Sequence, residues 1–363
     1  MKYNKKILIC SIFIIISFTI LIVISSKSTK TFNYNGSIIA LKVDGSDATS
    51  FPSKGKYNVT VNCKNGKGVW NPKTWKLEIT KIKGTVTCDI SFNSNASNLS
   101  NVVDANGTST THGIRYQGKN PDNYVWFNDE LWRIIGNVPV CLTSGCASIE
   151  NRVKLIRNDS IGAIVFNKTV FSSSSPFTWM GSNIQNLLNT CYLGKTSSCD
   201  SYCYSDGTSA VGTCDYSSDG IDASDYYGNM IEDVSYNVGV GDSTYKTADN
   251  YYTQEIASYA SSASKIGLMY ASDWGYAIEG FSGVLGSAGS PQSYSNKNWL
   301  FSNGYEWTMS AYSSIDPLYV SRGYLISNTT LTGFAVRPVL YLKSNVYVTG
   351  GTGSKVDPYR LGI

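Results

Sequence analysis

The segments NGYEWTMSAYSSIDPLYVSRGYLI, residues 303–326, and GFAVRPVLYL, residues 333–342, lie near the end of the chain and decide its fold. Charged side chains stand beside aromatic ones in them, in particular Glu306, Trp307 and Arg337. A buried charge needs a partner of opposite sign, so this cluster indicates either a catalytic centre or the inside of a fold. The rest of the chain must distinguish the two interpretations.

The composition is typical of an exported, strand-rich protein. Charged residues make up only 15% of the 363 residues, whereas Tyr (26) and Gly (33) are abundant. This balance suits a β-rich extracellular protein better than a cytosolic helical enzyme. The formal net charge of +4 is too small to indicate a nucleic-acid partner, so we expect none.

The N-terminus predicts attachment to a membrane. Residues 7–24 carry no charge and, as a helix, would span about 27 Å, close to the hydrocarbon thickness of a bilayer. Lys2, Lys5 and Lys6 precede them, so a single-pass helix would keep the N-terminus cytoplasmic and the bulk of the chain extracellular. The alternative is that residues 1–26 are a cleaved signal segment and the protein is secreted.

Eight cysteines follow this segment. An even number on the exported side of a membrane predicts disulfides. A zinc site is disfavoured because His112 is the only histidine and the spacings match no common zinc motif. The pairing among the last four stays open at this point. The cysteines are Cys63, Cys88, Cys141, Cys146, Cys191, Cys199, Cys203 and Cys214.

Three regions follow the N-terminal segment. Residues 36–92 read as half-buried antiparallel strands, which predict a small immunoglobulin-like β-sandwich with Cys63 and Cys88 placed to bridge two strands. Residues 93–111 are polar and rich in Asn and Ser, so they are expected to be a linker. Residues 112–363 form the large domain, which opens with a hairpin in which YVWF and LWRIIGNV flank a turn at NDE.

Two helices are expected inside the large domain. WMGSNIQNLLNTCYL has apolar residues at helical spacing behind a possible Ser182 cap, and DNYYTQEIASYASSASK is the second candidate. Together with the strands, these helices predict an α+β class. The chain closes with the strand AVRPVLYL and a final hairpin.

Four motifs occur in order in the large domain: KIGLMYASDWGYA (265–277), YEWTMS (305–310), VSRGYL (320–325) and GFAVRPV (333–339). They resemble the motif series of the formylglycine-generating-enzyme (sulfatase-modifying-factor) branch of the C-type-lectin-like fold. The domain also looks like an uncharacterised domain of Gram-positive bacterial surface proteins. The resemblance implies a C-terminal C-type-lectin-like domain in which Trp307 packs the core and Glu306 and Arg337 form an internal polar pair.

The chain departs from the enzymes of that branch. Those oxidases use a late pair of copper-binding cysteines, whereas this chain has no cysteine after Cys214. The calcium and sugar motifs of sugar-binding C-type lectins are also missing. We therefore predict that the protein is not an enzyme, that it has no cofactor, and that Glu306, Trp307 and Arg337 are structural.

The most informative surface is predicted at residues 199–252. Ten acidic residues against Lys246 alone give this segment a net charge of −9, and tyrosines with Ser, Gly and Asn recur through it. Such a composition is typical of binding loops, because rigid amphipathic rings give contact area at a small entropic cost. A solvated surface insertion without a ligand is the alternative. The ligand-binding candidates are Tyr202, Tyr204, Tyr216, Tyr226, Tyr227 and Tyr236.

Four aspartates in the same segment raise the possibility of calcium, a cation that prefers several oxygen ligands. They are Asp215, Asp219, Asp222 and Asp225, and their spacing does not fit an EF-hand. The preferred function is non-catalytic recognition of an extracellular glycan or protein by a membrane-anchored cell-surface protein. A secreted hydrolase of cell-wall or host polysaccharide and a structural envelope protein are the alternatives.

Overall fold

The computed structural model describes residues 30–207, 214–239, 241–257, 263–286 and 295–363. Its contacts divide the chain into two compact units. The smaller unit contains most of residues 30–93, and the larger unit contains Ser94–Ile363 together with residues 56–58 and 71–76.

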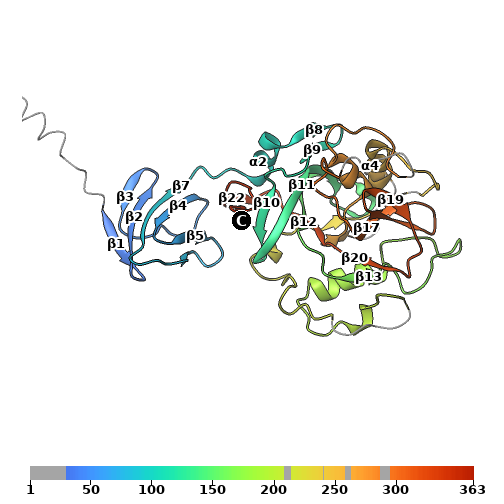
Figure 1. Cartoon of the computed structure of the whole chain (residues 1–363), viewed down its shortest axis with the longest axis horizontal. Helices are drawn as coiled ribbons and strands as arrows, with labels where there is room; N and C mark the ends of the chain where they lie inside the picture. Colours follow the sequence, from blue (N-terminus) through green and yellow to red (C-terminus); the bar gives the residue numbers. More distant parts are fainter. Residues whose placement is uncertain (1–29, 208–213, 240, 258–262, 287–294) are drawn as a thin grey trace, which may run out of the picture. The chain divides into compact units, whose positions relative to one another are not determined.

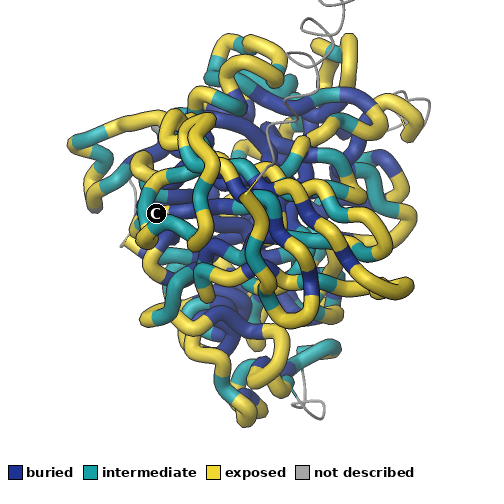
Figure 2. Tube along the Cα trace, turned by 90° about the vertical axis from the view of Figure 1, so that its left-hand side faces the viewer, coloured by how far each residue is buried: buried dark blue, intermediate teal, exposed yellow. Residues whose placement is uncertain are grey.

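The smaller unit is built from strands in which more buried and more exposed residues alternate, which the changing colours along the tube illustrate (Figure 2). Its main sheet has the order β1-β2-β7-β4, with β3 added to β2, and β5 and β6 form a separate hairpin. β2 and β7 run parallel, so the expectation of antiparallel strands does not hold for this pair. The strands are β1 (Thr31–Tyr34), β2 (Ser37–Val43), β3 (Ser46–Ala48), β4 (Asn58–Lys64), β5 (Lys67–Asn71), β6 (Lys76–Thr80) and β7 (Thr87–Asn93).

Aromatic side chains fill the centre of the smaller unit. The ring of Trp70 lies 4.8 Å from that of Phe92 and 5.0 Å from that of Phe51, centroid to centroid. The Cys63–Cys88 disulfide ties β4 to β7 beside this cluster. A unit this small cannot bury a large apolar core, so a covalent bridge adds stability that packing alone would not supply.

A nine-stranded sheet forms the frame of the larger unit, with the order β16-β21-β12-β11-β10-β23-β22 and with β9 and β8 added beside β11. The long β11–β12 hairpin runs through its middle (Figure 1). β10 meets β11 at the predicted turn, where Asn128 and Asp129 both adopt positive φ, as the tight turns of two-residue hairpins require. The strands are β8 (Thr108–Thr110), β9 (Gly113–Arg115), β10 (Tyr124–Phe127), β11 (Glu130–Cys141), β12 (Ile149–Arg157), β16 (Ile266–Gly267), β21 (Val339–Tyr341), β22 (Tyr347–Gly350) and β23 (Tyr359–Gly362).

A second sheet has five strands in the order β13-β20-β17-β18-β19. It contains the strands of residues 303–326 and the first strand of residues 333–342, whereas β21, later in the second segment, belongs to the nine-stranded sheet. A short β14–β15 pair lies apart from the two sheets. The buried side chains of the larger unit form one continuous core cluster. The strands are β13 (Ala163–Val165), β14 (Val234–Ser235), β15 (Ala263–Ser264), β17 (Tyr305–Ala311), β18 (Pro317–Ser321), β19 (Tyr324–Ser327) and β20 (Gly333–Ala335).

The predicted α+β class is wrong, because the structure is mostly β, with 38% strand and 13% helix. The helix expected near Ser182 is a single turn, α3 (Asn183–Asn186), that continues as π-helix over Leu187–Tyr192. Its Asn189 side chain accepts hydrogen bonds from the backbone of residues 265 and 266. These bonds tie the π-helical turn to the backbone at the start of β16.

The remaining helices are α2 (Leu99–Asn106), α4 (Ala248–Ala257) and α5 (Ala271–Tyr276). α2 lies inside the segment expected to be a linker, and its Leu99 and Val103 belong to the core cluster. Within the described residues, every helix is too short or too polar to cross a bilayer. Residues 7–24, on which the predicted membrane helix rests, lie outside the described part of the chain.

Four disulfides confirm the predicted framework. The last four cysteines pair in sequence order, which settles the connectivity that the sequence left open. Cysteines that are joined as disulfides cannot serve as zinc ligands, since a metal binds the thiolate. The pairs are Cys63–Cys88, Cys141–Cys146, Cys191–Cys199 and Cys203–Cys214.

Candidate functional site

An open depression of about 370 Å³ lies where the chain enters α4. We call it the Tyr245 depression. Its lining comes from the segment before α4, the first two turns of α4, and one residue after α5. The lining residues are Thr244, Tyr245, Lys246, Thr247, Asn250, Thr253, Gln254 and Val284.

The start of α4 fixes one wall of the depression. Thr247 caps the helix, because the backbone N–H of Asn250 donates to its Oγ1 at 3.2 Å. Asn250 and Thr253 are exposed and lie three residues apart, so they project from the same face of the helix. This places an amide and a hydroxyl group side by side at the mouth of the depression.

A local ion pair holds the segment that leads into α4. Lys246 Nζ lies 2.6 Å from Oδ1 and 2.7 Å from Oδ2 of Asp242. The hydrogen bonds from Lys246 and Thr244 hold the pKa of Asp242 at about 2, well below its usual range. The Lys246 charge is thereby neutralised within the segment, so it is not offered to a ligand.

Tyr245 is the one aromatic residue among the described residues that line the depression. Its ring packs on Tyr312 with centroids 4.9 Å apart, and burial raises the pKa of its hydroxyl above the ordinary value. The side chain is half-buried, which leaves part of an ordered aromatic surface open to solvent. No Asp or Glu occurs among the lining residues that the structure describes, so the depression offers no carboxylate pair for acid–base hydrolysis.

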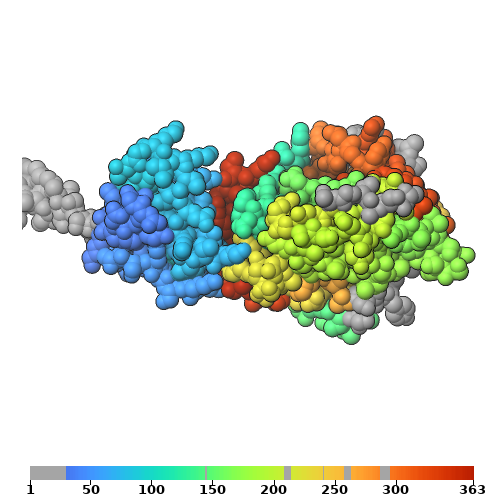
Figure 3. All heavy atoms as spheres, turned by 90° about the horizontal axis from the view of Figure 1, so that it is seen from below, coloured from blue at the N-terminus to red at the C-terminus, as the bar shows by residue number. Residues whose placement is uncertain are grey.

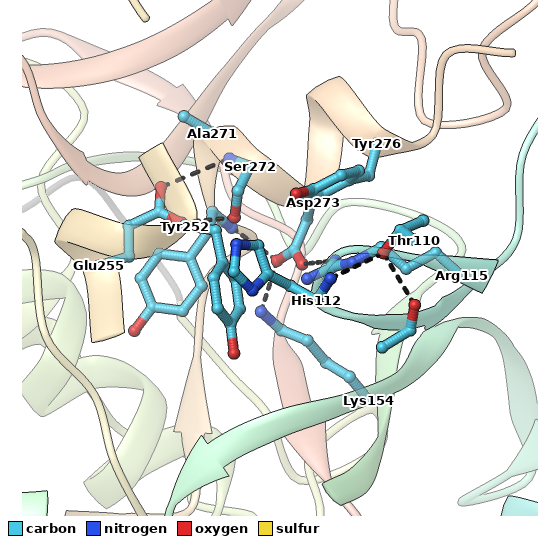
Figure 4. A network of polar contacts seen from close by, with 12 residues as sticks. Thr110, His112, Arg115, Lys154, Tyr252, Glu255, Ala271, Ser272, Asp273 and Tyr276 are labelled. Carbon is cyan, nitrogen blue, oxygen red and sulfur yellow. Dashed lines mark hydrogen bonds and ion pairs between the residues drawn. The ribbon is translucent and has the colours of Figure 1, made fainter. Parts of the chain in front are cut away.

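Behind this wall, α4, α5, β9 and β12 contribute charged side chains to a buried network (Figure 4). Asp273 accepts hydrogen bonds from Arg115 at 2.7 Å, from the Tyr270 backbone N–H at 2.9 Å, and from Lys154. Burial alone would raise the pKa of Asp273, but Lys154 and Arg115 outweigh it and hold the pKa below the ordinary value. The carboxylate is therefore ionised and joins β9, β12 and α5 through their side chains.

Glu255 occupies a different environment on the buried side of α4. Figure 4 shows it reaching Ser272, whereas the neighbouring Asp273 turns toward Arg115 and Lys154. Its carboxyl group also accepts from Ser310. Because no cation among the described residues forms an ion pair with it, burial dominates and raises its pKa from 4.5 to about 7.

His112 lies at the edge of this network. Its ring stacks on Tyr252 with centroids 4.0 Å apart, and its Nε2 lies 3.1 Å from Oδ1 of Asp249. Asp249 also accepts from the Tyr276 hydroxyl at 3.2 Å. These contacts connect the β8–β9 turn with α4. In the described part of the chain, no serine or cysteine side chain bonds to the imidazole, so the arrangement is not that of a nucleophile with its base.

The tyrosines predicted to bind ligand are not gathered into one surface. Tyr216, Tyr227 and Tyr236 are buried in the core cluster, while Tyr202, Tyr204 and Tyr226 are partly exposed. The surrounding segment nevertheless covers a broad part of the larger unit, in lime and yellow, on the face seen in Figure 3. Tyrosine in this segment therefore contributes to packing as well as to surface.

The four aspartates proposed for calcium bond to their own loops. Asp215, Asp222 and Asp225 each accept a backbone N–H two residues ahead, and Asp219 bonds to the Ser218 hydroxyl. Across the residues that the structure describes, no group of three or more His, Cys, Asp or Glu converges on a point that could hold a metal ion. These carboxylates stabilise turns.

Glu306 of β17 and Arg337, in the link between β20 and β21, are brought together. Arg337 Nε donates to Glu306 Oε1 at 2.7 Å. Burial raises the pKa of Glu306, and Arg337 offsets part of that rise. Trp307 is buried, and its indole N–H donates to the Ile164 carbonyl at 2.8 Å. All three side chains are occupied in packing, which fits a structural role for the segment with which the sequence analysis began.

No protein-family model, curated protein or solved structure matches this chain. The resemblance to the formylglycine-generating-enzyme branch therefore stays a prediction from four short motifs.

Sequence reasoning missed both the Tyr245 depression and the buried network. Arg115, Lys154, Glu255 and Asp273 come from four separate elements, so no local motif joins them. The one available signal was Lys154, a charged residue that stands between the apolar residues Val153 and Leu155 in a strand. Tyr245 lies in the segment expected to bind ligand, but nothing in the sequence sets it apart from its neighbouring tyrosines.

Proposed function

We propose that the protein is a non-catalytic, extracellular recognition protein that binds a neutral glycan in the Tyr245 depression. The observation that carries the proposal is an ordered, half-buried aromatic ring surrounded by exposed hydroxyl and amide groups, in a depression of about 370 Å³. A sugar presents apolar C–H faces and many hydroxyl groups. The half-buried Tyr245 ring and the Thr and Asn side chains in the lining match both.

The charges of the lining support a neutral ligand. Lys246 is paired with Asp242, and the described lining residues include no carboxylate. Recognition would then rest on hydrogen bonds and ring packing, and it would depend weakly on salt. The four disulfides support placing this activity outside the cell, where such bonds persist.

The test is a binding screen of the purified, oxidised chain on neutral and anionic glycans, peptidoglycan fragments and mucins. We expect saturable binding to a neutral glycan without turnover, unchanged by a calcium chelator. Asn250→Ala should weaken it roughly tenfold, which corresponds to the loss of one or two hydrogen bonds. The matched control is Asn151→Ala, an exposed asparagine on β12 that does not line the depression.

The other outcomes are informative. Turnover of a glycan would favour a hydrolase, and binding that is indifferent to Asn250→Ala would place the site elsewhere. A folded sample that binds no member of the screen would overturn the glycan proposal and favour a structural role in the envelope.

A further inference from the structure

Two loops meet at one end of the smaller unit. The turn between β4 and β5 (Lys64–Lys67) lies beside the loop that leads into β7 (Lys81–Thr85). The backbone N–H of Lys83 donates to the Asn65 carbonyl at 2.7 Å, and the Asn65 side chain donates to the Thr85 carbonyl at 3.0 Å. The two loops therefore form one ordered surface, which we call the lysine tip.

The lysine tip has an unusual combination of side chains. Lys64, Lys67, Lys81 and Lys83 are all exposed, and none of them forms an ion pair with another described residue. Ile82, between two of these lysines, is 61% exposed. The sequences of the two loops, KNGK and KIKGT, contain no acidic residue.

These properties select the chemistry of a partner. Four uncompensated ammonium groups on one small surface attract anions, and lysine binds phosphate as a point charge without the planar geometry of arginine. An exposed isoleucine in the middle gains nothing from a hydrated, phosphate-rich polymer, but it gains free energy by entering the acyl region of a bilayer. Charge and apolar exposure together favour a lipid surface over a soluble polyanion.

We propose that the lysine tip docks on an anionic lipid bilayer, with the four lysines at the headgroup phosphates and Ile82 inserted between them. The interaction is independent of the Tyr245 depression, since it uses only residues of the smaller unit. It would be electrostatic at long range and therefore sensitive to salt.

The test uses the full chain with an environment-sensitive fluorophore at the tip. Cys10→Ser removes the one cysteine outside the four disulfides, and Ile82→Cys supplies a single labelling position in place of the inserting side chain. Vesicles of phosphatidylglycerol are compared with vesicles of phosphatidylcholine. A second chain is labelled through Ser46→Cys, at the exposed first residue of β3. It reports whether vesicle association of the chain as a whole changes the signal.

We expect a blue shift and a rise in fluorescence intensity at position 82 with phosphatidylglycerol only. Adding 0.5 M salt should reverse both changes, because it shortens the electrostatic screening length to about 4 Å. In the labelled chain, Lys81→Gln with Lys83→Gln should raise the half-maximal lipid concentration roughly 25-fold, about fivefold for each lysine near a charged surface. The matched control, Lys30→Gln with Lys42→Gln, removes the same charge elsewhere in the smaller unit and should change it less than threefold.

Three results would overturn the proposal. One is a response at position 82 no larger than that at position 46. Another is an equal response with phosphatidylcholine. The third is equal loss of response in the two lysine double variants. If a soluble glycerol-phosphate polymer binds the chain in a way that depends on Lys81 and Lys83, while vesicles give no signal at position 82, the tip recognises a polyanion and not a lipid surface.

Discussion

Replacing Glu255 with Gln tests the most consequential electrostatic feature of the larger unit. Burial raises the pKa of this carboxyl group from 4.5 to about 7, so the folded protein holds the proton more tightly than the unfolded chain does. The difference corresponds to about 3 kcal/mol of unfolding free energy. That stabilisation is fully present below pH 4.5 and is lost as the pH rises from 4.5 through 7. A glutamine side chain at this position would stay neutral throughout, so the variant would not show this loss.

The assay is urea unfolding with the disulfides intact, at half-unit steps from pH 4.5 to 8. The unfolding free energy of the Glu255→Gln variant minus that of the wild type should rise by about 3 kcal/mol across this range, whatever its value at pH 4.5. The exposed Glu279→Gln serves as the control for introducing an amide. A difference that stays flat with pH would refute the reasoning, because it would mean that Glu255 ionises in the folded state as readily as in the unfolded chain.

Three further substitutions test the rest of the scaffold. Asp273→Asn should destabilise the protein by about 3–5 kcal/mol in urea unfolding, because it leaves two buried cations without their counter-charge, and a loss under about 1 kcal/mol would contradict the network. Joint replacement of Cys63 and Cys88 by Ser should lower the free energy of unfolding of the smaller unit by about 3 kcal/mol. The measurement is urea unfolding with and without reductant, and reductant should destabilise the variant less than it destabilises the wild type. Glu306→Gln should lower the free energy of unfolding by about 2 kcal/mol, as expected for weakening a buried charge-assisted hydrogen bond, and an unchanged value would remove Arg337 as its partner.

The sequence carried strong information wherever the fold depends on local chemistry. The Asn128–Asp129 turn follows from residues that tolerate positive φ, and the disulfides follow from the even number of cysteines after residue 24. Helix content was overestimated because helical spacing near Ser182 says nothing of side chains such as Asn189, which bond to a distant strand. Such tertiary contacts exist only in the folded structure.

The candidate site was less accessible from the sequence for a related reason. Composition located a tyrosine-rich segment but could not tell the buried Tyr236 from the half-buried Tyr245, since both lie among small polar residues. The Tyr245 ring packs against Tyr312, which lies far along the chain. The exposure of a ring therefore depends on contacts between distant residues, which composition does not reveal. The same holds for Glu255, whose unusual pKa depends on serines from two other elements.

The order of the disulfides bears on how the chain acquires its structure. The four pairs are separated by 25, 5, 8 and 11 residues, and none crosses or encloses another. Each bond can therefore close as soon as its second cysteine has been made, before any later cysteine is available as a wrong partner. Maturation can proceed vectorially from the N-terminus, and the oxidised chain needs little isomerisation to reach its native connectivity.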